Sequence, residues 1–122
     1  VVEEMKLYLG VDTYNSTRST NQVEMCPLEY MRGRNFHNAF MILDEAQNAT
    51  YEQIKMFITR IGSDSKAVIN GDAGQTDLDN RSGGGLNACM EKLQHVTGVA
   101  VCKLTDEDIV RNSIISRILA KL

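Results

Sequence analysis

A short apolar run that ends in two adjacent acids constrains this chain more than any other feature. Residues 39–43 read Ala-Phe-Met-Ile-Leu, which is too short for a helix on its own and apolar enough for a strand covered on both faces. Two shorter runs, 67–69 and 99–101, lie next to Gly71 and Gly98, and glycine commonly begins or ends such elements. Together the runs predict three parallel core strands.

The sequence after the acids changes to a helical period. Thr50 and Gln53 match a capping box, in which two side chains satisfy backbone amides at a helix start, and Gly62 predicts the helix end. Apolar side chains recur at three- and four-residue spacings and share one helical face: Tyr51, Ile54, Phe57, Ile58 and Ile61. We therefore expect an amphipathic helix between Thr50 and Gly62.

Helices and strands alternate along most of the chain. A second helix is predicted at 86–94, and a third begins near Thr105. The inward residues of the second helix are expected to be Leu86, Cys89, Met90 and Leu93. Upstream, we expect a short helix at 1–9, an exposed polar loop at 11–22 and a short strand at 23–26. This order predicts an α/β fold with a mainly parallel sheet and flanking helices.

The composition excludes several classes of protein. The chain has 122 residues, 43% hydrophobic and 24% charged, which predicts one soluble domain. No apolar stretch approaches the roughly 18 residues of a membrane helix, and no signal-peptide pattern begins at Val1. A cytoplasmic location without a membrane partner is therefore expected. The net charge of −3 gives no global positive field for nucleic acid, and a local basic patch stays open.

The cysteines and histidines show no metal-ligand spacing. Cys26, Cys89 and Cys102 are far apart and form no C-x-x-C pair, so we expect reduced, mostly buried thiols. His37 and His95 belong to no H-E-x-x-H pattern and are interpreted as bystanders.

The acid pair after the first apolar run has the form of a Walker B motif. At the carboxyl end of a parallel strand, Asp44 is the candidate ligand of Mg²⁺. Glu45 is the candidate base that orients and deprotonates the water attacking a γ-phosphate. The alternative is that the two acids merely end a strand and begin a loop.

Two glutamines and a further acid extend this pattern. Gln47 completes a DEAQ-type sequence, and residues 71–75 read Gly-Asp-Ala-Gly-Gln, which resembles the G-D-x-x-Q motif of superfamily 1 helicases. We expect Gln75, together with Gln47, to sense the γ-phosphate, and Asp72 to belong to the nucleotide-binding set. The alternative for Gln75 is a polar residue that closes a turn.

These motifs form part of a longer resemblance that runs from about Val23 to the C-terminus. The matching segments are 30–34, 39–48, 52–62, 71–78, 82–86 and 105–111, and together they resemble the PhoH family. The resemblance implies a RecA-like P-loop NTPase domain with ATP and Mg²⁺ as cofactors. It also implies a link to phosphate starvation, RNA or single-stranded nucleic acid as a partner, and a homo-oligomer.

Three arginines have two interpretations each. Arg111 matches an arginine of the family's C-terminal motif, which implies contact with ATP phosphate in cis or across a subunit boundary. Alternatively, Arg111 is an exposed helix residue paired with Glu107 or Asp108. Arg32 and Arg34 either line the nucleotide or nucleic-acid face or form salt bridges near the Walker B strand.

One part of a P-loop ATPase is missing from the sequence. No G-x-x-x-x-G-K-[ST] motif occurs, and residues 83–85, Gly-Gly-Gly, lack the lysine and are interpreted as a flexible helix entry. In the family that loop lies upstream, so Val1 is expected to be an internal position. The chain alone should then be inactive, with unpaired sheet edges and marginal stability or self-association. The other hypotheses are a non-catalytic binding or assembly module and ATP-driven remodelling of RNA or DNA.

Overall fold

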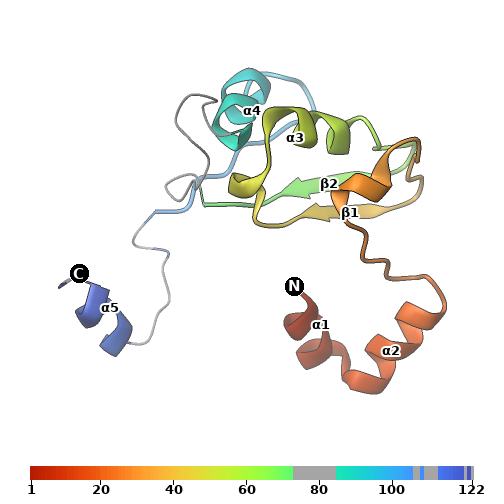
Figure 1. The fold of residues 1–122 in the computed structure, drawn as a ribbon, viewed down its shortest axis with the longest axis horizontal. Helices are drawn as coiled ribbons and strands as arrows, with labels where there is room; N and C mark the ends of the chain where they lie inside the picture. The colour runs from red at the N-terminus through yellow and green to blue at the C-terminus, as the bar shows by residue number, and fades with distance from the viewer. Residues whose placement is uncertain (73–84, 106–107, 109–112, 120, 122) are drawn as a thin grey trace. The chain divides into compact units, whose positions relative to one another are not determined.

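The computed structural model describes residues 1–72, 85–105, 108, 113–119 and 121 (Figure 1). The chain forms two compact units, residues 1–92 and 93–122. The elements up to the end of α4 are α1 (Val2–Leu9), α2 (Val11–Ser19), the 3-10 helix η1 (Leu28–Met31), β1 (Phe40–Leu43), the 3-10 helix η2 (Ala46–Asn48), α3 (Tyr51–Ile58), β2 (Lys66–Ile69) and α4 (Gly85–Leu93). The second unit contains α5 (Ser113–Leu119).

Two of the three predicted strands are present, and they pair in parallel as expected. β1 and β2 align Phe40 with Lys66 and Leu43 with Ile69. A parallel bridge between Phe36 and Ile61 lies upstream of the two strands. Figure 1 shows both strands running in the same direction, so their carboxyl ends lie at the same edge of the sheet.

The predicted strands at 99–101 and 23–26 are wrong. Neither segment has strand structure, and the Val99 N–H donates to the Val96 carbonyl in a turn. A strand is stabilised by hydrogen bonds to a neighbouring strand, and in the described part of the chain the sheet contains β1 and β2 alone. Apolar β-branched residues do not form a strand without such a partner.

α3 begins where the sequence predicts and ends a turn earlier. Thr50 Oγ1 accepts from the Gln53 N–H, and the Gln53 side chain accepts from the Thr50 N–H, which completes the capping box. Ile54 and Phe57 are buried, a contribution of about 1.5–3 kcal/mol each. The predicted end at Gly62 is wrong, because Ile61 leaves the helix for its bridge with Phe36.

α4 confirms the predicted second helix, with Leu86 and Cys89 buried. Gly85 is not simply a flexible entry. A Cβ atom there would collide with backbone atoms of residues 49–51, so the glycine permits close packing of α4 on the start of α3. Burial raises the pKa of the Cys89 thiol, which disfavours its reactive thiolate form.

The expectation that the first strand is covered on both faces is wrong within the described residues. Met41 and Leu43 are buried, whereas Phe40 is 66% exposed and Ile42 is 46% exposed. The alternation arises because successive strand residues point to opposite faces and α3 and α4 lie on one side of the strands (Figure 1).

The N-terminal helix is confirmed, and the predicted polar loop after it is wrong. Residues Val11–Ser19 form α2, in which the buried Tyr14 directs its hydroxyl to the Met25 sulfur at 3.7 Å. The Thr17 hydroxyl donates to the Tyr14 carbonyl one turn back, at 2.7 Å. The polar side chains therefore bond within the helix instead of opening a loop, and helix propensity is a weak guide when an aromatic residue is buried.

In the second unit, α5 forms part of the predicted third helix. The Thr105 N–H and hydroxyl both donate to Asp108 Oδ2, at 2.7 and 3.2 Å, as at a capped helix start. Residues 106–107 and 109–112 lie outside the described residues. Among the helices of the described part, none is both long and apolar enough to cross a membrane.

Candidate functional site

The acid pair lies directly after β1, at the edge where both strands end. Asp44 is exposed, and its Oδ1 atom accepts two hydrogen bonds, from Asn70 Nδ2 at 2.9 Å and from the Glu45 N–H at 3.1 Å. Both donors are electrically neutral. They therefore orient the carboxylate without cancelling its charge.

Glu45 adopts a backbone conformation that is uncommon for a residue with a side chain. Its φ and ψ are 54° and 39°, in the left-handed region, where a non-glycine residue carries a cost of about 1–3 kcal/mol. The turn lets Glu45 Oε2 accept a hydrogen bond from Gln47 Nε2 at 2.6 Å. Backbone strain of this kind is concentrated at functional sites, so it supports a role for the turn.

Gln47 connects the two sequence motifs. Its side chain is buried in η2; the amide nitrogen donates to Glu45, and Oε1 accepts from the Asp72 N–H at 3.1 Å. A Cβ atom on Gly71 would lie 2.7 Å from Gln47 Oε1, so the glycine of the G-D segment permits this contact. Two successive hydrogen bonds through the Gln47 side chain therefore connect Glu45 to Asp72, and we refer to them as a hydrogen-bonded chain.

Asn70 is a site residue that the sequence did not single out. Its backbone N–H donates to the Leu43 carbonyl at 2.8 Å, and its carbonyl accepts from the Ala46 N–H at 2.9 Å. Together with its side-chain bond to Asp44, these contacts bracket the acid-bearing turn, which we define as residues 43–46. The available signal was its place between the second apolar run and Gly71, at the end of a predicted parallel strand.

The acid-bearing turn has no cationic partner among the described residues. Glu3, Glu24 and Glu52 form ion pairs in this part of the chain, and no ion pair of Asp44 or Glu45 occurs among the described residues. The described residues also contain no group of three His, Cys, Asp or Glu side chains able to hold a metal ion. The exposed carboxylate of Asp44 fits Mg²⁺, which proteins commonly bind through one or two carboxylates, water and substrate phosphate.

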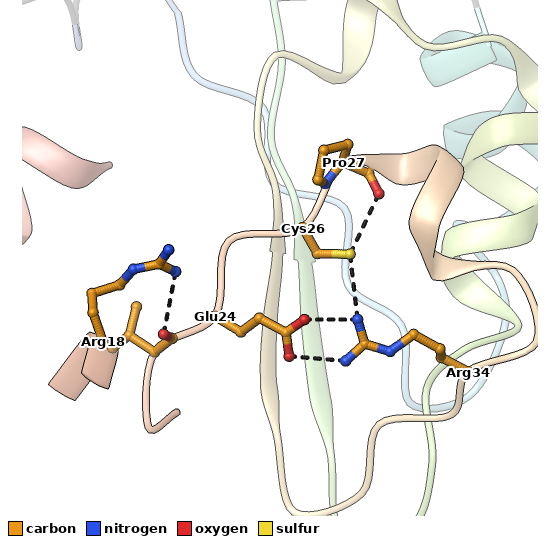
Figure 2. Close-up of polar contacts among 6 residues, drawn as sticks. Arg18, Glu24, Cys26, Pro27 and Arg34 are labelled. Carbon is orange, nitrogen blue, oxygen red and sulfur yellow. Dashed lines mark hydrogen bonds and ion pairs between the residues drawn. The ribbon is translucent and has the colours of Figure 1, made fainter. Parts of the chain in front are cut away.

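Arg34 lies in a different polar cluster, shown in Figure 2. Its guanidinium makes two hydrogen bonds to the Glu24 carboxylate, at 2.7 and 2.9 Å, and lies 3.5 Å from Cys26 Sγ. It also stacks 4.6 Å from the Phe36 ring centroid. The hydrogen bond from Arg34 lowers the pKa of Glu24, and the same pairing raises the pKa of Arg34. Of the two interpretations given for Arg34, the structure thus contains the salt bridge.

Of the remaining candidates, those that the structure describes make no hydrogen bond or ion pair with the acid-bearing turn. Arg32 is exposed at the end of η1. Gln75 and Arg111 lie outside the described residues, so their predicted roles stay predictions. His37 Nδ1 accepts a hydrogen bond from the Ser63 N–H at 3.0 Å.

The fold and site define a class of structure: an α/β region in which an acid pair and a G-D segment follow neighbouring parallel strands. The comparison with protein families agrees with this description. The family profile described as "PhoH-like protein" matches residues 1–122, and the chain belongs to that family.

Curated relatives carry the same family name. The PhoH-like protein of Mycobacterium tuberculosis (strain ATCC 25618 / H37Rv) is 45% identical over 101 residues, covering 83% of this chain and 29% of the relative. The PhoH-like protein of Bacillus subtilis (strain 168) is 40% identical, covering 91% of this chain and 35% of the relative. Protein PhoH of Escherichia coli (strain K12) is 43% identical, covering 80% of this chain and 28% of the relative. The matched part of the chain thus spans about a third of these relatives or less.

Proposed function

We propose that the protein carrying this chain is a P-loop NTPase that hydrolyses ATP in a Mg²⁺-dependent reaction. Membership of the PhoH-like family supports this proposal. The observation that carries it is the hydrogen-bonded chain from Glu45 through Gln47 to Asp72, which couples the acid pair after β1 to the G-D segment after β2. An acid pair that merely ended a strand would need no such connection.

The residues of the turn have separate tasks in this mechanism. A bound Mg²⁺ would supply the positive charge that offsets the charge of the phosphates. Asp44 is the carboxylate that would hold it, because its side chain is exposed and paired with neutral donors alone within the described residues. Glu45 takes the proton of the attacking water, and the Gln47 amide holds the Glu45 carboxylate in place for that transfer.

The phosphate-binding loop is assigned to another part of the protein. These 122 residues contain no Gly-Lys dipeptide, and relatives are about three times longer than the region they share with the chain. The lysine and backbone amides that cradle the phosphates are therefore proposed to lie outside this chain. RecA-like strand order around that loop belongs to the same proposal.

The test is a matched pair of substitutions in the full-length protein. Glu45→Gln removes the base and keeps the shape of the side chain, so turnover should fall by about 10²–10⁴-fold while ATP binding is retained. Glu24→Gln makes the same change in the Arg34 cluster and should leave turnover near wild type. Steady-state hydrolysis and equilibrium nucleotide binding measure the two effects. Unchanged turnover in Glu45→Gln would sink the assignment, and absence of turnover in wild type would favour a non-catalytic binding module.

Coupling to RNA or single-stranded DNA is a further part of this proposal, as is a role in phosphate starvation. The coupling is supported by the resemblance of Gln47 and residues 71–75 to helicase motifs. Adding single-stranded RNA or DNA to the full-length enzyme should increase turnover. A rate independent of nucleic acid would instead indicate a stand-alone ATPase.

A further inference from the structure

Asn70 is fixed on the acid-bearing turn by its backbone as well as its side chain. Its N–H and carbonyl bond to Leu43 and Ala46, on either side of the acid pair, at 2.8 and 2.9 Å. The Asn70 side chain therefore starts from a constrained position when it donates to Asp44. Its amide group therefore bonds to one particular oxygen of that carboxylate, Oδ1.

That oxygen has no remaining capacity for a cation. Each oxygen of an ionised carboxylate offers about two lone pairs, and both on Asp44 Oδ1 accept hydrogen bonds, from Asn70 Nδ2 and the Glu45 N–H. Oδ2 receives no hydrogen bond from the residues that the structure describes. Asp44 therefore presents a single oxygen rather than a two-oxygen ligand.

We propose that Asn70 is a positioning residue that restricts Asp44 to one metal-facing oxygen and thereby favours Mg²⁺ over Ca²⁺. Mg²⁺ demands near-ideal octahedral geometry and uses few carboxylates, whereas Ca²⁺ takes six to eight oxygens and accepts bidentate carboxylates. Blocking Oδ1 removes the bidentate option. This inference rests on the proposed function, since it takes Asp44 as the metal-holding carboxylate.

The experiment measures the affinity of the full-length protein for a fluorescent ATP analogue in Mg²⁺ and in Ca²⁺. Wild type should bind more tightly in Mg²⁺. Asn70→Ala should reduce this preference by about 10-fold, because it frees Oδ1 for the bidentate binding that Ca²⁺ accepts, and losing a hydrogen bond to a metal ligand typically changes metal affinity by that factor or more. Asn87→Ala, at an exposed asparagine on α4, is the matched control and should keep the wild-type ratio. If Asn70→Ala and Asn87→Ala show the same ratio of affinities in Mg²⁺ and in Ca²⁺, the proposal is overturned.

A second variant keeps the test decisive if Asn70→Ala does not fold. Asn70→Asp preserves the side-chain shape and backbone bonds, but replaces the donor with an additional carboxylate, so the preference should shift further toward Ca²⁺. A wild-type ratio in Asn70→Asp overturns the proposal. A wild-type protein that does not bind the analogue in either metal contradicts the proposed function itself. Normal binding with unchanged ratios in both variants contradicts the role of Asn70 alone.

Discussion

The acid-bearing turn and the Glu24–Arg34 cluster hold carboxylates in opposite ways. Asp44 and Glu45 receive hydrogen bonds from side-chain amides and a backbone N–H, all neutral, whereas Glu24 is paired with a guanidinium. Neutral donors fix geometry and leave negative charge available, while an ion pair satisfies the charge internally. The difference separates a site prepared for a cation from a contact that connects two segments of chain.

The largest effect should come from Gly71, because its substitution is expected to change both stability and turnover. In Gly71→Ala, the new Cβ would lie 2.7 Å from Gln47 Oε1 and 2.9 Å from the Gln47 backbone nitrogen, so the buried Gln47 must shift. Overpacking of this kind costs about 1–3 kcal/mol in the free energy of unfolding, measured by denaturant titration. The shift should also release Glu45 and lower turnover.

Gly10→Ala provides the control for this prediction. Gly10 has a φ of 79° and no atom within 4 Å of the added Cβ, so alanine there introduces backbone strain without contacting Gln47. Its ψ of 151° places it in a backbone region used almost only by glycine, so alanine should lower stability by about 1–3 kcal/mol and leave turnover intact. If Gly71→Ala behaved in the same way, Gln47 would not connect the two motifs functionally.

The smallest effect should come from Glu24→Gln, measured as stability against pH and salt. Arg34 lowers the Glu24 pKa from its ordinary 4.5, so the pair stabilises the fold above pH 4.5 and loses this contribution as pH falls through the lowered value. Wild type and Glu24→Gln should therefore differ slightly at neutral pH and converge in acid. High salt should reduce the difference, because the pair is exposed. A difference that persisted in acid would show that Glu24 acts through packing rather than charge.

Features coded by neighbouring residues were predicted from the sequence. The Thr50–Gln53 capping box and the apolar face of α4 depend on spacings within one element, and both are present. The pairing of β1 with β2 followed from two apolar runs separated by a helix. α2 was missed because Asn, Ser and Thr favour loops in general, whereas here hydroxyls bond within the helix and Tyr14 is buried.

Features that depend on strand register could not be predicted in the same way. The acid pair was identified as a candidate, but the donors that orient it were not. Asn70 reaches Asp44 because Leu43 aligns with Ile69, which places the next residues of the two strands side by side. The strand predicted at 99–101 was wrong for a related reason. Its apolar residues do not reveal whether a partner strand lies beside them.

The most direct test of the acid-bearing turn as a metal–nucleotide site is a crystal structure of the full-length protein with Mn²⁺ and a non-hydrolysable ATP analogue. The anomalous signal of Mn²⁺ would locate the metal independently of the protein density. We expect a metal peak on the Oδ2 side of Asp44, next to the terminal phosphate, with Asn70 still bonded to Oδ1. A nucleotide and metal bound away from Asp44 and Glu45 would contradict the assignment of the acid-bearing turn as the metal–nucleotide site.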